Sequence, residues 1–159
     1  MAPSKTRAIF LKSFPKGLPS PDQFELREID LPALKDGEVL MRVIWMSVDP
    51  YMRGRMRPDI KSYIPPFTLE DPLDGGAVGE VVESKHDKFK PGDHVVGFQG
   101  GWREFAGVSG DGLTRVDAGI APLSAYLGVL GMPGLTAWAG LTQILKPKEG
   151  ETLFVSGAA

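Results

Sequence analysis

Up to about Val116, the sequence alternates short apolar or β-branched runs with clusters of turn-forming residues. The chain contains 20 Gly and 14 Pro among its 159 residues, and many of them stand between these runs. Many short strands separated by Pro/Gly turns are typical of a small barrel or sandwich. The expected strands are Arg7–Leu11, Phe24–Ile29, Val39–Val48, Gly79–Ser84, His94–Phe98, Trp102–Val108 and Leu113–Val116.

Local patterns within this part support strands and tight turns. In "KPGDHVV", Pro91 takes the second position of a turn and Gly92 the third, which is the chemistry of a type II turn. Within the third run, a period of two places alternate apolar residues on one face. That expected face consists of Val39, Met41, Val43 and Trp45.

From Pro122 onward the pattern becomes helical and then changes again. Leucines at positions 123, 127 and 130 follow helical spacing, and a second helix is expected from Gly134 to Leu145, after an interruption at "GMPG". Pro147 should end that helix, because the residue before a proline is biased away from helical conformation. Finally, Thr152–Val155 is a short apolar run before small residues, typical of a buried strand that feeds a glycine-rich loop.

Composition excludes several classes of protein. The net charge is −2, so the basic excess expected of a nucleic-acid or anionic-membrane partner is missing. The sequence has no cysteine, which excludes disulfides, thiolate catalysis and Cys-ligated zinc. It also has no signal-peptide core and no apolar stretch of about 18 residues. A cytoplasmic protein is the expectation.

Few residues suggest chemistry by themselves. His86 and His94 have no second ligand at metal-binding spacing, so His86 is expected to be a solvated loop residue and His94 a residue at the edge of a strand. "DGGAVGEV", residues 74–81, leads into a strand instead of a helix and therefore lacks the helix N-terminus that binds anions. Its glycines are interpreted as bulges or close backbone approaches.

The most informative stretch is "MSVDPYMRGRM", residues 46–56. Asp49 can cap a helix whose first residue is Pro50, and this turn exposes Tyr51 at the end of a strand. Tyr51 could equally be a core aromatic residue with a satisfied hydroxyl. The three arginines that follow, Arg53, Arg55 and Arg57, are expected to form a solvated and partly ion-paired face.

Four motifs occur in order: "MSVDPYMRGRM", "KPGDHVVGFQGGWREFAGV", "LGVLGMPGLTAWAGL" and "PKEGETLFVSGAA". Together they resemble the zinc-independent medium-chain dehydrogenase/reductases, in the branch of prostaglandin and leukotriene reductases, alkenal double-bond reductases and curcumin reductases. The resemblance implies a mainly β fold, a GroES-like partly open barrel with short helices, followed by the first strand of a truncated Rossmann domain. The implied divisions are a substrate domain over 1–121, connecting helices over 122–149 and the start of a dinucleotide-binding domain over 150–159.

The resemblance also implies site residues. Tyr51 resembles the family tyrosine that lines the substrate pocket beside the nicotinamide, and Tyr63 resembles a second pocket tyrosine; both are assigned as candidate catalytic residues. Met132, Pro133 and Thr136 resemble the segment that packs on the nicotinamide of NADPH. Alternatively, Tyr63 only covers the barrel mouth, and Thr136 only bonds its own helix backbone. The small residues Gly157, Ala158 and Ala159 resemble the start of the phosphate loop.

Two hypotheses follow. In the first, the chain is the substrate-side part of an NADPH-dependent reductase of the C=C bond in α,β-unsaturated ketones and aldehydes. It would then be a fragment, inactive alone, of an enzyme that the resemblance implies to be a homodimer at full length. In the second, it is a self-standing GroES-like binding module, such as a co-chaperonin or scaffold. The motifs "DPYM" and "GMPG" favour the first hypothesis, because a co-chaperonin has no use for them.

Overall fold

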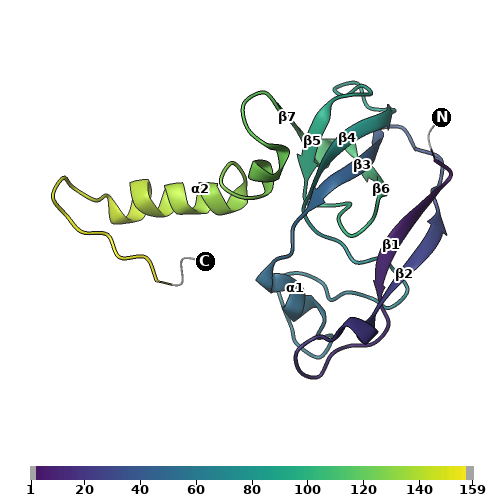
Figure 1. The fold of residues 1–159 in the computed structure, drawn as a ribbon, viewed down its shortest axis with the longest axis horizontal. Helices are drawn as coiled ribbons and strands as arrows, with labels where there is room; N and C mark the ends of the chain where they lie inside the picture. Colours follow the sequence, from purple (N-terminus) through teal and green to yellow (C-terminus); the bar gives the residue numbers. More distant parts are fainter. Residues whose placement is uncertain (1–2, 157–159) are drawn as a thin grey trace.

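The computed structural model describes residues 3–156 and contains two antiparallel sheets and several short helices (Figure 1). The larger sheet has five strands in the order β6-β3-β4-β5-β7, so β3 lies between β6 and β4. The elements, in chain order, are β1 (Lys5–Leu11), the 3₁₀ turn η1 (Pro21–Gln23), β2 (Phe24–Asp30), β3 (Glu38–Met46), α1 (Pro50–Arg55), β4 (Ala77–Ser84), β5 (His94–Gly97), β6 (Phe105–Ser109), η2 (Gly110–Gly112), β7 (Leu113–Val116), η3 (Leu123–Leu127), α2 (Met132–Ala139) and η4 (Gly140–Leu145).

The smaller sheet, β1 with β2, closes one side of the barrel without completing it. The two strands pair in register from Lys5 opposite Asp30 to Leu11 opposite Phe24. Two backbone hydrogen bonds join β1 to the segment before β6, from Glu104 N–H to Arg7 O at 3.0 Å and from Ile9 N–H to Trp102 O at 2.9 Å. A mainly β, partly open barrel was expected, and the structure confirms it.

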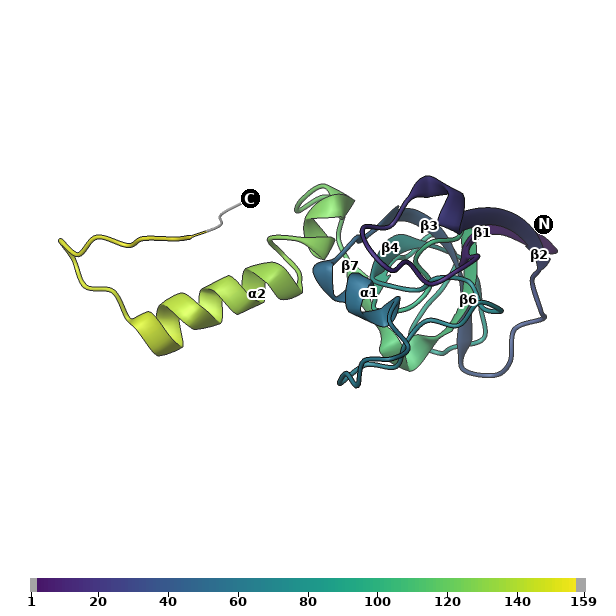
Figure 2. The ribbon, with the colours of Figure 1, turned by 90° about the horizontal axis from the view of Figure 1, so that it is seen from below.

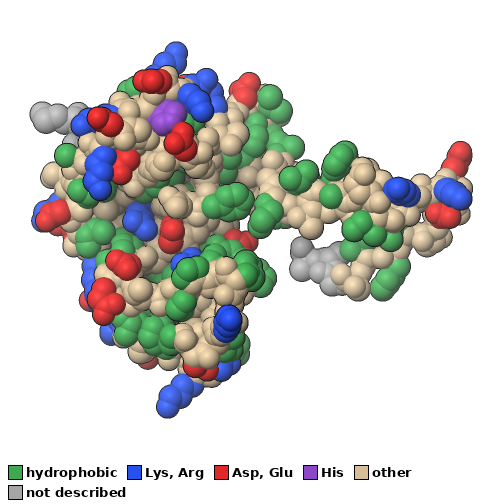
Figure 3. Space-filling view, turned by 180° about the vertical axis from the view of Figure 1, so that it is seen from behind, with side chains coloured by type: hydrophobic (Ala, Val, Ile, Leu, Met, Phe, Trp, Pro, Cys, Tyr) green, Lys and Arg blue, Asp and Glu red, His purple; other side chains and the backbone are tan. Residues whose placement is uncertain are grey.

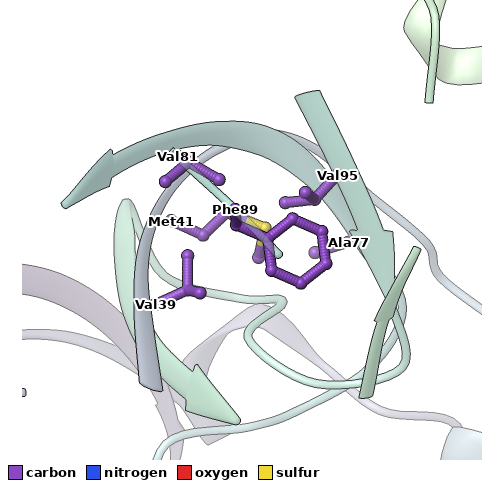
Figure 4. Packing of buried hydrophobic residues seen from close by; sticks show 6 residues of the cluster. All are labelled: Val39, Met41, Ala77, Val81, Phe89 and Val95. Atoms are coloured by element: carbon purple, nitrogen blue, oxygen red, sulfur yellow. The ribbon is translucent and has the colours of Figure 1, made fainter. Parts of the chain in front are cut away.

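The barrel encloses one apolar core between the sheet and the loop after β4 (Figure 4). Val39 and Met41 of β3 are fully buried, and Phe89 of the loop packs into the same space. Each fully buried side chain of this size contributes roughly 1.5–3 kcal/mol relative to an exposed one. The cluster consists of Val39, Met41, Ala77, Val81, Phe89 and Val95.

A second apolar cluster lies beneath the sheet, where α1 meets β1. Its buried members are Leu11, Met52, Met56, Phe67 and Leu73. Tyr51 and Trp102 are partly buried and pack against it. This cluster packs α1 against β1 and the segment from Phe67 to Leu73.

The apolar face predicted for β3 is only half right. Val39 and Met41 are buried, but the Trp45 side chain is 54% exposed. The pairing of β3 with β4 shifts register between Leu40 and Met41 and again between Val43 and Trp45. The first shift skips Val82 of β4, so Val39 and Met41 still share a face. The second skips Ile44 of β3, which breaks the period of two and turns Trp45 out of that face.

Four predicted strand boundaries are wrong by two or more residues, and two of them belong to strands that start earlier than predicted: β1 begins at Lys5 instead of Arg7, and β4 at Ala77 instead of Gly79. β6 begins at Phe105 instead of Trp102, because Trp102 has a φ of +62°, which an extended strand cannot contain. β3 ends at Met46 instead of Val48, where the chain turns into α1. The "KPGD" turn is confirmed: Gly92 has a φ of +89°, and Asp93 N–H bonds to Lys90 O at 3.1 Å.

After β7 the chain leaves the barrel. η3 packs against β3 and β4, whereas α2 and η4 project as an arm (residues 132–145), visible in Figures 1 and 2. The second predicted helix starts two residues too late, because Met132 and Pro133 of "GMPG" are its first turn, where proline is well tolerated. It ends at Leu145, before Pro147 as predicted, with Lys146 in left-handed conformation.

Apolar side chains lie along this arm (Figure 3). From Ala118 to Leu145 the sequence has no charged residue. The predicted strand Thr152–Val155 follows the arm, yet it pairs with no strand within residues 3–156, and Phe154 is 86% exposed. A strand of this kind normally pairs with parallel strands in a sheet that is covered on both faces, and the described residues provide no such partner strand. Its place in a dinucleotide-binding domain stays a prediction.

Candidate functional site

Helix α1 begins at the predicted residue. Asp49 has an extended backbone and Pro50 is the first helical residue. The Ser47 hydroxyl donates to the Asp49 carboxylate at 2.6 Å, and Asp49 N–H points to the Met52 sulfur at 3.4 Å. Because Met52 is buried, α1 is anchored, and Tyr51 is held at the end of β3.

Tyr51 combines a packed ring with an unpaired hydroxyl. The hydroxyl makes no hydrogen bond within the part of the chain that the structure describes, although the ring packs against the second apolar cluster. Burial raises the pKa of Tyr51, and the Asp49 carboxylate raises it further, whereas Arg55 opposes them. Tyr51 is therefore a neutral phenol at physiological pH and can donate its proton to an acceptor.

Two glycine-containing loops meet beside Tyr51. One Asp74 carboxylate oxygen accepts from Gly75 N–H at 2.9 Å and from Gly100 N–H at 2.8 Å, which ties the loops together. A Cβ on Gly75 would collide with Met52, and a Cβ on Gly79 would collide with the backbone of the neighbouring strand β3. The structural interpretation of the glycines in residues 74–81 is confirmed.

An open cavity of about 310 Å³ lies next to these loops. Arg103 contributes a side chain that is 22% exposed, 3.9 Å from Asp74. Burial lowers the pKa of Arg103, while Asp74 and then Asp71 oppose that shift. The volume of this cavity is at the lower end of the range found for ligand pockets. The lining residues are Arg55, Pro66, Phe67, Thr68, Asp71, Pro72, Asp74 and Arg103.

The three arginines in and just after α1 do not form the solvated face that was expected. Arg53 donates to backbone carbonyls of the 15–17 loop, at 2.6 Å for the shorter bond. The Arg55 guanidinium stacks on Phe67, 3.9 Å from the ring centroid. Within the described residues, Arg57 alone of the three forms an ion pair, with Asp59 at 2.9 Å. The first two arginines therefore fasten loops to α1, which spacing along a helix cannot reveal.

The other predicted catalytic residue, Tyr63, lies on the loop after α1 and is 90% exposed. It is near enough to Tyr51 to raise the pKa of that phenol slightly. Tyr63 is not packed into the Tyr51 site. A pocket role and a cover over the barrel mouth therefore both remain predictions.

The predicted nicotinamide segment lies on the arm. Met132 and Pro133 form the exposed start of α2, and the Thr136 hydroxyl donates to Met132 O at 2.8 Å. This is the helix-backbone bond that the alternative interpretation of Thr136 foresaw. The exposed hydroxyl keeps its lone pairs free, so it can still accept from a carboxamide. Gly157, Ala158 and Ala159 lie outside the described residues.

The histidines form no metal site. Within residues 3–156 no group of three metal-ligating side chains is found. His86 is on a loop as predicted, but it is not solvated: its side chain is 10% exposed and packs near Phe89. His94 is the first residue of β5.

Within residues 3–156, no helix has the length and apolar character needed to cross a membrane.

Three residues of this site were missed from the sequence: Asp74, Trp102 and Arg103. The signal for the last two was "GGWR", because a glycine pair before a large aromatic residue marks unusual backbone. Asp74 gave no usable signal, since its role depends on a hydrogen bond to Gly100, 26 residues away.

Comparison with known proteins places this geometry in a family. Residues 7–116 match the family described as the N-terminal domain of oxidoreductase. The NADPH-dependent curcumin reductase of Escherichia coli is 46% identical over 154 residues, covering 97% of this chain and 44% of that protein. The NADP(+)-dependent 2-alkenal reductase of Nicotiana tabacum is 37% identical over 158 residues, covering 96% of this chain and 46% of that protein.

A solved structure of a related protein has the same fold as this chain. CurA from Vibrio vulnificus, crystallised in complex with NADPH, superposes with a TM-score of 0.80 at 40% identity, covering 91% of this chain and 42% of that chain. The family match and these relatives thus define an oxidoreductase N-terminal domain. The chain belongs to this family, and its relatives include the curcumin and 2-alkenal reductases. It spans less than half the length of the relatives it matches.

Proposed function

We propose that this chain is the substrate-side part of an NADPH-dependent reductase that saturates the C=C bond of α,β-unsaturated ketones and aldehydes. The observation that carries the proposal is Tyr51: a neutral phenol whose hydroxyl makes no hydrogen bond within residues 3–156, on a helix held by the second apolar cluster. Its relatives include an NADPH-dependent curcumin reductase and a 2-alkenal reductase.

The residues present fit the nicotinamide end of the cofactor. Thr136 offers an exposed hydroxyl with free lone pairs, and Met132 offers an exposed apolar side chain one turn earlier. When bound, NADPH would supply hydride to the β-carbon of the substrate. The phosphate-binding residues proposed from the sequence lie outside the described part, so the fit concerns this end alone.

Tyr51 would act on the substrate carbonyl. Hydride addition at the β-carbon moves negative charge onto the carbonyl oxygen, and a phenol proton donated to that oxygen stabilises the charge. A raised pKa keeps the Tyr51 proton in place before the reaction. The packed ring limits the directions that the hydroxyl can take, which lowers the entropic cost of alignment.

A chimera tests the proposal. Residues 1–159 replace the matching segment of the Escherichia coli curcumin reductase, and NADPH oxidation is followed at saturating enone, with the parent enzyme as control. We expect a product heavier than the substrate by two hydrogens and still carrying its carbonyl. A folded, NADPH-binding chimera that forms allylic alcohol, or no product, would refute the proposal. The 159-residue chain alone should show neither activity nor measurable NADPH binding by calorimetry.

A further inference from the structure

Trp102 has a backbone conformation that a tryptophan rarely adopts. Its φ is +62°, in the left-handed region that favours glycine. Two bonds hold it there, from Trp102 N–H to the Met46 sulfur at 3.2 Å and from Ile9 N–H to Trp102 O at 2.9 Å. Such strain persists only where the surroundings enforce it, and it concentrates at functional sites.

The side chain of Trp102 carries a second unfavourable feature. Its indole Nε1 is buried, and within the described residues it has no hydrogen-bond partner. Buried N–H groups are nearly always paired, because an unpaired one loses its bonds to water without replacement. A chain that needed only an apolar side chain here could use Phe, which has no N–H to bury.

The unpaired indole N–H and the unpaired Tyr51 hydroxyl border the same spot. A Cβ built on Gly75 would lie 3.7 Å from Trp102 Nε1 and 3.7 Å from Tyr51 Oη. The two atoms are therefore separated by no more than twice that distance. Both side chains also pack against the same apolar cluster, and the flexible end of Met52 lies at the same spot.

We propose that Trp102 is a positioning residue for Tyr51: its indole N–H donates to the Tyr51 hydroxyl oxygen once the flexible end of Met52, which lies at the same spot, moves aside. With that oxygen engaged as an acceptor, the Tyr51 proton is directed away from the cluster and toward a bound carbonyl. Bonds in such a chain strengthen one another, so the phenol becomes a better donor. The carbonyl as acceptor rests on the proposed function; the link between the two side chains does not.

The link is tested first on the 159-residue chain, by titrating ¹³Cζ-labelled tyrosines with NMR. Asp49, Arg55, Asp74 and Tyr63 also influence this phenol and are left unchanged. Removing a donor to the phenolate in Trp102→Phe should move the Tyr51 titration to higher pH. The resonances of the other two tyrosines serve as internal references, and Trp138→Phe, which removes an exposed indole from the arm, should change nothing. An unmoved Tyr51 titration in Trp102→Phe overturns the proposal.

Two further experiments address the case in which the variant does not fold and the effect on the reaction. If Trp102→Phe does not fold, β-(3-benzothienyl)alanine at position 102 keeps the shape of the indole and replaces its N–H by sulfur. In the chimera, Trp102→Phe should lower kcat about three- to tenfold, the effect of one hydrogen bond, without changing NADPH affinity. In a Tyr51→Phe background the same change should have no effect on kcat. Additive losses would assign Trp102 a packing role alone. If the chimera is inactive, the titration still decides the link.

Discussion

Replacing Tyr51 by Phe separates a chemical role from a packing role. The hydroxyl makes no hydrogen bond within the described residues, whereas the ring packs against the second apolar cluster. Tyr51→Phe should therefore change the free energy of unfolding by less than about 0.5 kcal/mol. If the hydroxyl donates to the carbonyl oxygen, the same change should reduce kcat/KM by about 5–30-fold, or roughly 1–2 kcal/mol of transition-state stabilisation. Loss of a central oxyanion donor costs more, but here the cofactor ribose hydroxyl and a tyrosine outside this chain, both implied by the family resemblance, would share the task.

Tyr126 provides a matched control for this substitution. Its hydroxyl donates to Asp117 O at 2.8 Å and accepts from Asp117 N–H at 3.3 Å, so it is already paired within the chain. Tyr126→Phe should thus cost about 1 kcal/mol of stability and leave kcat/KM unchanged, the opposite pattern to Tyr51→Phe. Tyr51→Ala should show both effects, since it also removes the ring, and should lower Tm by about 5–10 °C.

The measurements are calorimetric unfolding of the chain and steady-state kinetics of the chimera at saturating NADPH, with one small and one bulky enone. Equal rates for wild type and Tyr51→Phe on both enones would refute the chemical role. Tyr51 would then be a wall of the pocket, and Tyr51→Ala would raise KM alone.

Three more predictions follow from packing, charge and exposure. Gly79→Ala should lower Tm by several degrees in a thermal melt, because the added Cβ collides with the Arg42 carbonyl across the sheet, at a cost of roughly 1–3 kcal/mol; an unchanged Tm would contradict this close approach. The Lys90 backbone N–H and then Arg115 hold the pKa of Asp93 below its ordinary value, so its stabilisation is complete above about pH 4 and is lost as the pH falls through the lowered pKa. Asp93→Asn should therefore flatten the fall of Tm between pH 5 and 2, and an unaltered slope would count against it. Hydrogen exchange over Thr152–Val155 should be fast in the dilute chain, and light scattering should show self-association through the exposed apolar arm at higher concentration; full protection in a monomer would disprove both.

Patterns over a few neighbouring residues carried most of the correct predictions. The Asp49-Pro50 helix start, the "KPGD" turn and the end of η4 before Pro147 each depend on local conformational preferences. The barrel class followed from strands spaced by turns. The solvation of Arg53 and Arg55 was predicted wrongly, because their partners are far away along the chain. Arg53 bonds to the 15–17 loop, and Arg55 stacks on Phe67.

The sequence by itself determined the class of fold, the family and the placement of Tyr51 at a strand end, because short-range preferences and motif order encode these features. Only the tertiary structure decided the bulge that exposes Trp45, the meeting of the Asp74 and Gly100 loops, and the buried indole N–H of Trp102 near Tyr51. Each of these depends on contacts between segments far apart in the chain. Such contacts form only when burial of the two apolar clusters offsets the entropy of bringing those segments together, and no local pattern records which atoms then face one another.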